Sequence, residues 1–295
     1  MSSVAVVAHK RKSLGDGLGA LRRVLAERGH PAPMWFEVAK SKEAWAASRR
    51  AVDGGADLLF VWGGDGTVQH CVDALAGSPV DLAVVPAGTA NLLASNLRIP
   101  TDLHAAVDIG LYGARRRLDV GVLNGKRFAV MAGVGLDAVM MRNASSELKD
   151  QLGRLAYVWT GARASRLHVP TAKIAVDGKP WFHGKASCIL LGQMGNLVGG
   201  LVPFPDARPD DGILEVGVTT AQGTLQWARV VARLALGHPE RSPLARMTRG
   251  REIEIKLDEP TAYQLDGGAR KPRRRLLATV EPGAITVCVP VRTQR

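Results

Sequence analysis

The sequence predicts two kinds of structure in one chain of 295 residues: an α/β domain built on a parallel sheet, then a mostly antiparallel β domain. Up to about residue 115, short apolar runs alternate with longer amphipathic stretches. This pattern is typical of parallel strands that are covered by helices on both faces. Beyond residue 115, short strand-like segments follow one another, separated by glycine or polar turns. The length suits two domains, which we place at 1–114 and 115–295.

The first domain alternates predicted strands with predicted helices. The strands are short and apolar, at 4–8, 35–38, 57–62 and 82–85. The helices carry apolar residues at helical spacing, at 14–28, 41–52 (with Ser41 as a candidate N-cap) and 68–75. Ligands of such sheets bind beyond the carboxyl ends of the strands. We therefore expect functional residues directly after the third and fourth strands.

The second domain is predicted to be rich in strands. The strand-like segments are 118–122, 127–132, 172–176, 186–191, 214–218, 252–257, 276–280 and 285–289. Asn124-Gly125-Lys126 and Asp177-Gly178-Lys179 are hairpin signals. Helical stretches are predicted only at about 147–165 and 224–236.

The chain is strongly basic, with a net charge of +12 and a pI of about 10.1. Basic proteins attract phosphate, whether in a nucleotide, an anionic lipid or a nucleic acid. No zinc-finger spacing or aromatic RNA-binding signature is present, so we predict no nucleic-acid partner. A late basic cluster is either a solvated loop or a contact with an anionic membrane surface; it consists of Arg270, Lys271, Arg273, Arg274 and Arg275.

The compartment is predicted to be the cytoplasm. Cys71, Cys188 and Cys288 lie far apart and outside paired motifs, which indicates reduced thiols rather than a disulfide framework or a zinc site. The first residues lack the order of a signal peptide. No apolar run approaches the roughly 18 residues of a membrane span. We expect a soluble or peripherally membrane-associated protein.

The sharpest motif is Gly63-Gly64-Asp65-Gly66-Thr67, between an apolar strand and a predicted helix. Glycines allow positive φ angles and let a phosphate chain approach the backbone. The N–H groups of such a loop and of the first helical turn can then face the anion. Thr67 adds a hydroxyl, and Asp65 either holds Mg²⁺ through water or orients the loop. The alternative is a tight turn with Thr67 as the helix cap.

A second loop, Pro86–Asn91, follows the fourth strand. Backbone at Gly88 and the hydroxyl of Thr89 are candidate phosphate contacts, and Asn91 is placed to cap or brace the loop. Alone this pattern is weak, but it is expected at the same sheet edge as the first loop and therefore supports a nucleotide site.

Gly133–Ala138 fits the spacing of a dinucleotide fingerprint, but that motif requires a βαβ unit. Because these residues fall in the β-rich half, we interpret them as a glycine-rich turn. Two acidic turns, Pro209–Gly212 and Gln264–Gly268, are either ordinary β-turns or sources of carboxylates. A magnesium-dependent kinase needs carboxylates near its phosphates and a base near the accepting hydroxyl.

In order along nearly the whole chain, these motifs resemble the bacterial diacylglycerol kinase and sphingosine kinase-like lipid kinase family. The carrying segments are 63–67, 86–91, 118–120, 133–138, 210–214, 265–267 and 287–290. The Gly-Gly-Asp-Gly-Thr motif alone is shared with NAD kinases. The resemblance implies a Rossmann-like, NAD kinase-like first domain, a C-terminal β-sandwich and a cleft between them as the active site. It allows the last residues to return to the first domain.

The resemblance also implies roles for particular residues. ATP would bind at 63–67 and Thr89, under a first loop made of His9, Lys10, Arg11, Lys12 and Ser13. Asp266 would be the general base that takes the proton of the lipid hydroxyl. Asp211 would bind Mg²⁺ together with the carbonyls of Arg208 and Ile213, and Asp65 would join that ion's water network.

The chain departs from the family pattern at four places. The usual Asn-Pro-x-Ser-Gly of the first loop is replaced by residues 9–13. Gln69-His70 is found where the family usually has Asn-Glu, and Leu92 is found where the family commonly has Asp. Gly268 stands where the family has Glu after Asp-Gly, and the loss of that carboxylate would weaken metal binding or turnover.

The sequence therefore predicts an ATP-dependent lipid kinase, with diacylglycerol as the first candidate acceptor and phosphatidic acid as the product. An NAD kinase-like or other soluble-acceptor kinase is the nearest alternative. A degenerate kinase that senses nucleotide or lipid without turnover is the alternative from another class. A homodimer is left open.

Overall fold

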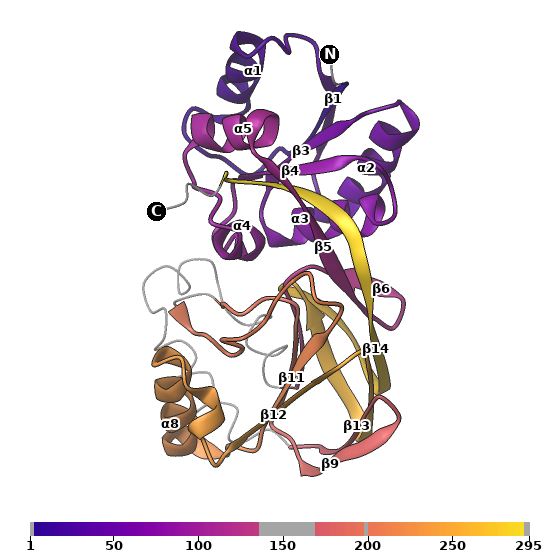
Figure 1. Cartoon of the computed structure of the whole chain (residues 1–295), viewed down its shortest axis with the longest axis vertical. Coiled ribbons are helices and arrows are strands. Elements are labelled where there is room, and N and C mark those ends of the chain that lie inside the picture. The colour runs from indigo at the N-terminus through magenta and orange to yellow at the C-terminus, as the bar shows by residue number, and fades with distance from the viewer. Residues whose placement is uncertain (1–2, 136–168, 198–199, 292–295) are drawn as a thin grey trace. The chain divides into compact units, whose positions relative to one another are not determined.

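The computed structural model describes residues 3–135, 169–197 and 200–291, which form two compact units (Figure 1). The first unit consists of residues 1–120 and 282–295, and the second of residues 121–281. The predicted division at 114/115 falls inside strand β5 (Ala114–Leu123).

The first unit is the predicted α/β domain with a parallel sheet. Its strands are β1 (Val4–His9), β2 (Met34–Val38), β3 (Leu58–Gly63) and β4 (Asp81–Pro86), in the order β2-β1-β3-β4. All three pairings are parallel. Every residue of β1 and β3 is buried, which explains why these two strands are continuously apolar instead of alternating.

The helices of this unit are α1 (Gly17–Glu27), α2 (Ala44–Asp53), α3 (Asp65–Leu75), α4 (Leu92–Asn96) and α5 (Leu103–Tyr112). Helix α5 begins after Asp102, whose carboxylate accepts the N–H of Ala105 at 2.8 Å. The expected N-cap role of Ser41 is wrong. Ser41–Glu43 forms a 3-10 turn before α2 begins at Ala44, so the Ser41 hydroxyl is available for a different contact.

The second unit is strand-rich and mostly antiparallel, as predicted. Its main sheet has the order β12-β11-β10-β7-β13-β14. The strands are β6 (Lys126–Phe128), β7 (Met131–Gly135), β8 (Thr171–Val176), β9 (Lys179–Lys185), β10 (Cys188–Gly192), β11 (Leu214–Thr219), β12 (Ala245–Gly250), β13 (Glu252–Leu265) and β14 (Gly268–Val289). The predicted helix at 224–236 is α8 (Gly223–Ala235), and a 3-10 turn follows at Pro239–Arg241. The helix predicted at 147–165 lies outside the described residues.

Both hairpin predictions are confirmed. Asn124 and Gly125 have φ of 49° and 74°, and they join β5 to β6 with Leu123 opposite Lys126. Asp177 and Gly178 have φ of 49° and 76° and join β8 to β9. Two successive left-handed residues are what a tight hairpin turn requires.

Several details differ from the sequence-based expectations. Residues 133–135 of the predicted glycine-rich turn lie in β7, which pairs antiparallel with β10 and β13, and residues 136–138 lie outside the described residues. The antiparallel pairing of β7 is not that of a strand in a dinucleotide βαβ unit. Residues 276–280 and 285–289 belong to one long strand, β14, and the basic cluster lies in its exposed first part rather than in a loop. Strands β9 and β12 were not predicted, because their Pro, Gly and polar residues have low strand propensity and interrupt the apolar alternation.

The core contact of α5 provides a test of the packing. A Cβ added at Gly110 would lie 2.3 Å from the Phe60 ring and 2.8 Å from the Ala83 Cβ. Gly110→Ala is therefore expected to lower the free energy of unfolding by about 1–3 kcal/mol through overpacking. Gly19→Ala is the matched control, since its new Cβ would lie 4.0 Å from the end of the Arg23 side chain, an ordinary contact. Denaturant unfolding of the two variants checks this, and equal stability would contradict the packing.

Candidate functional site

The two glycine-rich loops meet at the carboxyl edge of the parallel sheet. Residue Gly64 follows β3, and Gly88 follows β4. A Cβ built on Gly88 would lie 2.4 Å from the Gly64 Cα, and one built on Gly64 would lie 3.2 Å from the Gly88 Cα. The backbones are therefore in direct contact. Gly88 has no room for a Cβ, and a Cβ at Gly64 would be tighter than an ordinary contact. Close approach therefore explains these glycines, and the expected positive φ angles are wrong, since neither Gly64 nor Gly88 has one.

Asp65 ties the two loops together. One of its carboxylate oxygens accepts the N–H of Asn91 at 3.1 Å, and the other accepts the N–H of Leu92. These bonds begin helix α4 from a residue that itself begins helix α3. Asp65 was predicted either to hold Mg²⁺ through water or to orient the loop. These hydrogen bonds support the second role.

Asn91 braces the second loop from inside. Its side-chain oxygen accepts the Gly88 N–H at 2.9 Å, and its side-chain nitrogen donates to the Gly88 carbonyl at 2.8 Å. The backbone of Asn91 is left-handed, with φ of 48°, a conformation that Asn tolerates better than most residues. Thr89, at the tip of this loop, is exposed.

Thr67 is placed behind the loop rather than on its surface. The residue is only 1% exposed, and its hydroxyl lies 3.2 Å from the hydroxyl of Ser41. Ser41 also faces Gly66, since a Cβ built there would lie 3.5 Å from the Ser41 hydroxyl. Ser41 is a polar group at this site that the sequence pattern does not reveal, because a serine before a helical pattern is most simply a cap.

The first loop brings a positive charge to the glycines. The carbonyl of Lys12 accepts the indole N–H of Trp62 at 3.0 Å. The Lys12 side chain lies 4.0 Å from the Cβ position of Gly64. In contrast, Lys10 forms an ion pair of 3.6 Å with Glu37, and Arg11 and Ser13 are exposed. Lys12 is thus the basic residue of this loop that the geometry brings to the glycine pair.

His9 is buried beneath this loop, with 7% exposure. Its ring Nδ1 accepts the N–H of Arg11 at 3.2 Å. Burial lowers the pKa of His9, and the charges of Lys12 and Arg11 lower it further. The imidazole is therefore neutral at pH 7, and it shapes the loop instead of adding a charge.

In the second unit, Asp266 is buried in a tight hairpin turn between β13 and β14, where it has a φ of 43°. Its carboxylate accepts three backbone N–H groups: Ala129 at 2.7 Å, Val130 at 2.9 Å and Met131 at 2.9 Å. Such bonds stabilise the charged carboxylate and fix its orientation. Asp266 therefore organises the segment that leads into β7.

Asp211 lies in an exposed turn before β11, and its carboxylate accepts the N–H of Ile213 at 3.1 Å. Burial raises the pKa of the nearby Glu215, the charges of Asp211 and Asp206 raise it further, and Arg249 opposes them. Asp206 and Asp211 therefore lie close enough to Glu215 to act on its charge, as does Arg249. Within the described ranges, no three His, Cys, Asp or Glu side chains form a ready-made metal site.

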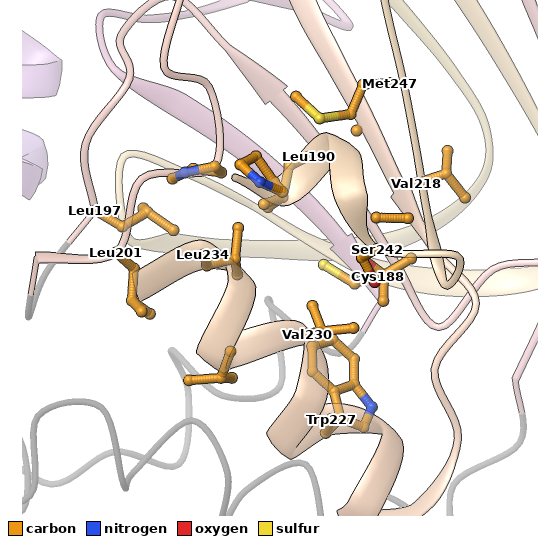
Figure 2. Close-up of a pocket in the computed structure, with 16 residues that line it drawn as sticks. Cys188, Leu190, Leu197, Leu201, Val218, Trp227, Val230, Leu234, Ser242 and Met247 are labelled. Atoms are coloured by element: carbon orange, nitrogen blue, oxygen red, sulfur yellow. The ribbon is translucent and has the colours of Figure 1, made fainter. Parts of the chain in front are cut away.

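The second unit also contains an apolar cavity of about 60 Å³ beside helix α8 (Figure 2). Helix α8 contributes one wall, and strands β10, β11 and β12 contribute another. The lining residues labelled in the view include Leu190, Leu197, Leu201, Val218, Trp227, Val230, Leu234 and Met247. An apolar cavity of this kind favours an apolar ligand over water, which needs polar partners.

Comparison with known proteins identifies the family. Residues 5–123 match the diacylglycerol kinase catalytic domain, and residues 129–289 match the YegS C-terminal NAD kinase beta sandwich-like domain. The chain belongs to the diacylglycerol kinase family of lipid kinases. The predicted resemblance, fold class and enzyme class are therefore confirmed.

Curated relatives agree with this assignment. The chain is 30% identical over 291 residues to a "probable lipid kinase YegS-like" protein of Pseudomonas fluorescens, covering 97% of this chain and 94% of the relative. It is 32% identical over 218 residues to a diacylglycerol kinase of Bacillus subtilis, covering 72% and 71% of the two chains.

Solved structures share the fold. A diacylglycerol kinase structure from Bacillus anthracis matches with a TM-score of 0.75 and 20% identity, covering 98% of this chain and 97% of the other. An NAD kinase from Archaeoglobus fulgidus in complex with ATP matches with a TM-score of 0.54 and 10% identity, covering 97% and 93%. In the part of this kinase that the structure describes, no helix is long and apolar enough to cross a membrane.

The contact between the loops can be tested by mutation. Gly88→Ala would place a Cβ 2.4 Å from the Gly64 Cα, which is backbone and cannot move aside cheaply. We expect the two loops to separate and the affinity for ATP to fall by about tenfold or more, which corresponds to roughly 1.4 kcal/mol. Gly19→Ala is the control, and calorimetry with Mg-ATP is the measurement. Unchanged affinity in Gly88→Ala would show that the loop contact is irrelevant to the nucleotide.

Proposed function

We propose that this protein transfers the γ-phosphate of ATP to the hydroxyl group of a lipid, with diacylglycerol as the first acceptor and phosphatidic acid as the product. The observation that carries the proposal is the direct backbone contact between Gly64 and Gly88 at the carboxyl edge of a parallel sheet. Membership of a lipid kinase family supports the choice of acceptor. We place the enzyme in the cytoplasm, acting peripherally at an anionic membrane surface.

The first unit is suited to hold the phosphates of ATP. Side chains are absent from the contact between Gly64 and Gly88, so a phosphate chain can approach the backbone there. The amino end of α3, an eleven-residue helix, begins at the same loop and favours negative charge. Within the described residues Lys12 makes no ion pair, so its charge is available to a phosphate.

The acidic turn in the second unit fits a magnesium ion. Asp211 offers a carboxylate, the main-chain carbonyls of Arg208 and Ile213 offer neutral oxygens, and Glu215 experiences the negative charge that a cation would offset. One carboxylate, carbonyls, waters and substrate phosphates form a normal environment for Mg²⁺. The bound ion would neutralise charge on the phosphates. Asp65 remains a proposed member of its water network.

The apolar cavity beside α8 supports a lipid acceptor. A soluble acceptor such as NAD would gain nothing from a cavity lined by Leu190, Trp227 and Leu234. Part of an acyl chain would lose water-exposed apolar surface by entering it. This argues for a lipid kinase over a kinase with a soluble acceptor.

We assign Asp266 as the proton acceptor for the lipid hydroxyl. Three N–H donors hold its carboxylate in a fixed orientation. Phosphoryl transfer depends mainly on positioning and charge neutralisation. A correctly aimed carboxylate therefore suits the reaction.

A non-catalytic sensor is the second candidate function, and one observation favours it. Gly268 stands where the family pattern has Glu, and the space for a side chain there is occupied by Arg270, whose Nη1 would lie 2.8 Å from a new Cβ. A positive group near Asp266 in place of a carboxylate would weaken metal binding and turnover.

Transfer of labelled γ-phosphate from Mg-ATP to diacylglycerol in mixed micelles tests the proposal. We expect a labelled lipid with the parent protein, and a turnover at least 100-fold lower with Asp266→Asn at unchanged ATP affinity, in the range of general-base catalysis. ATP binding without any labelled lipid would favour the sensor. A labelled soluble acceptor would contradict the lipid assignment.

Asp177→Asn is the matched control for Asp266→Asn. Asp177 also begins a two-residue hairpin turn with positive φ, and its carboxylate accepts the N–H groups of Arg251 and Glu252. Each substitution replaces one carboxylate oxygen with an amide nitrogen and removes a negative charge that accepts backbone N–H groups. Asp177→Asn should lower thermal stability but keep turnover. Equal turnover in both variants would refute the role of Asp266 as a base.

Filling the cavity should change the preference for acyl chains. Ala245 lines the cavity from β12, so Ala245→Leu would occupy part of it. We expect kcat/KM to fall about tenfold for long-chain diacylglycerol, and to change little for a short-chain, water-soluble acceptor. ATP affinity should stay constant. An equal loss for short and long chains would show that the cavity does not select the acyl chain.

A further inference from the structure

Helix α8 has two faces of different chemistry. Its inner face, which includes Trp227, Val230 and Leu234, lines the apolar cavity (Figure 2). Its outer residues are exposed and recur at helical spacing: Leu225, Arg229, Ala232, Arg233 and, at the C-cap, Leu236. These five residues, which we call the outer face of α8, fall within one side of the helix because they are spaced by three or four residues.

The outer face leaves two leucines in water. Leu225 is 66% exposed and Leu236 is 69% exposed. The two lie eleven residues apart, which is about 16 Å along a helix, so both can touch one plane only if the helix lies parallel to it. An interfacial helix lies in this way, with its exposed apolar side chains among the lipid headgroups.

The charges between the leucines are all positive. Arg229 and Arg233 are exposed, and among the described residues neither side chain makes a hydrogen bond or an ion pair. The sequence of α8, from Gly223 to Ala235, contains no Asp or Glu. The nearest acid that follows, Glu240, lies 3.7 Å from the guanidinium of Arg241. The outer face is therefore complementary to a surface that is both negative and apolar.

We propose that the outer face of α8 docks the protein on an anionic lipid bilayer, with Leu225 and Leu236 inserted and Arg229 and Arg233 bound to headgroup phosphates. The proposal rests on the proposed lipid kinase function, since it would bring the acyl-chain cavity on the inner side of the same helix to the membrane. It assigns docking to α8 and not to the basic cluster at Arg270–Arg275. Residues 271–275 of that cluster are exposed in β14, but the nearest exposed apolar side chain is Leu277.

Sedimentation of the full chain with large vesicles of phosphatidylcholine, with and without one-quarter phosphatidylglycerol, tests this docking. The parent should bind the anionic vesicles and bind neutral ones weakly. Arg229→Gln with Arg233→Gln should lower the partition coefficient roughly 30-fold, from about 1 kcal/mol for each basic residue near the surface. The control variant, Arg273→Gln with Arg274→Gln, removes the same charge from exposed positions. It should change the partition coefficient less than threefold.

A second pair of variants tests insertion rather than charge. Leu225→Ser with Leu236→Ser keeps the net charge and should lower binding about tenfold, including at high salt, where the contribution of the arginines is screened. Any of three results would overturn the proposal. The parent protein could fail to bind anionic vesicles, the α8 variants could bind like the parent, or the β14 variant could lose as much binding as the α8 variants.

Activity on a short-chain diacylglycerol in solution separates this inference from the proposed function. The α8 variants should keep the parent's turnover there, because the altered side chains point away from the cavity. Vesicle binding that depends on α8, without any kinase activity, would leave the docking surface in place and refute the proposed function. Kinase activity together with vesicle binding that is insensitive to the α8 variants would support the proposed function and refute the docking surface.

Discussion

The close approach of Gly64 and Gly88 is the constraint on which the nucleotide site depends. Strands β3 and β4 are parallel neighbours, so the loops that follow them lie at the same edge of the sheet. Because Gly64 and Gly88 have no side chains, the two loop backbones can touch. The other features of the site follow from this contact. Asp65 bonds across to the start of α4, Asn91 holds the shape of the second loop, and Lys12 lies over the glycine pair. A Cβ at Gly88 would collide with both Gly64 and the Asn91 side chain.

Asp266 shows how one carboxylate can be both part of the scaffold and part of the proposed chemistry. Its three N–H partners are consecutive residues of the chain, Ala129 to Met131. The backbone of Asp266 is itself held by a bond from its N–H to the Met131 carbonyl at 2.9 Å. The hairpin turn and the entry to β7 are thus fixed to each other, and any role of Asp266 toward a substrate is exercised from a rigid position.

Much of the fold could be predicted from the sequence, because β1 and β3 are buried on both faces and the turn pairs Asn124-Gly125 and Asp177-Gly178 have a strong local preference. The meeting of the two glycine loops followed from the rule for strand ends in parallel sheets. Ser41 and the burial of Thr67 could not be predicted, since both depend on how the turn before α2 packs against α3. Strands β9 and β12 were missed for a similar reason: their pairing partners, and not their own composition, make them strands.

Strand β14 has a consequence for the order in which the protein can be built. It begins at Gly268 in the second unit, and its last part pairs in parallel with β4 of the first unit, where Val287 lies opposite Leu82. The side chains of Ile285, Val287 and Cys288 are buried there. During synthesis from the N-terminus, the ribosome makes the whole second unit before it releases the strand that covers β4. Until then that edge of the first sheet is exposed to pairing with other chains. The first unit to be synthesised is therefore the last to be completed, and a fragment ending near residue 120 would lack one of its own strands.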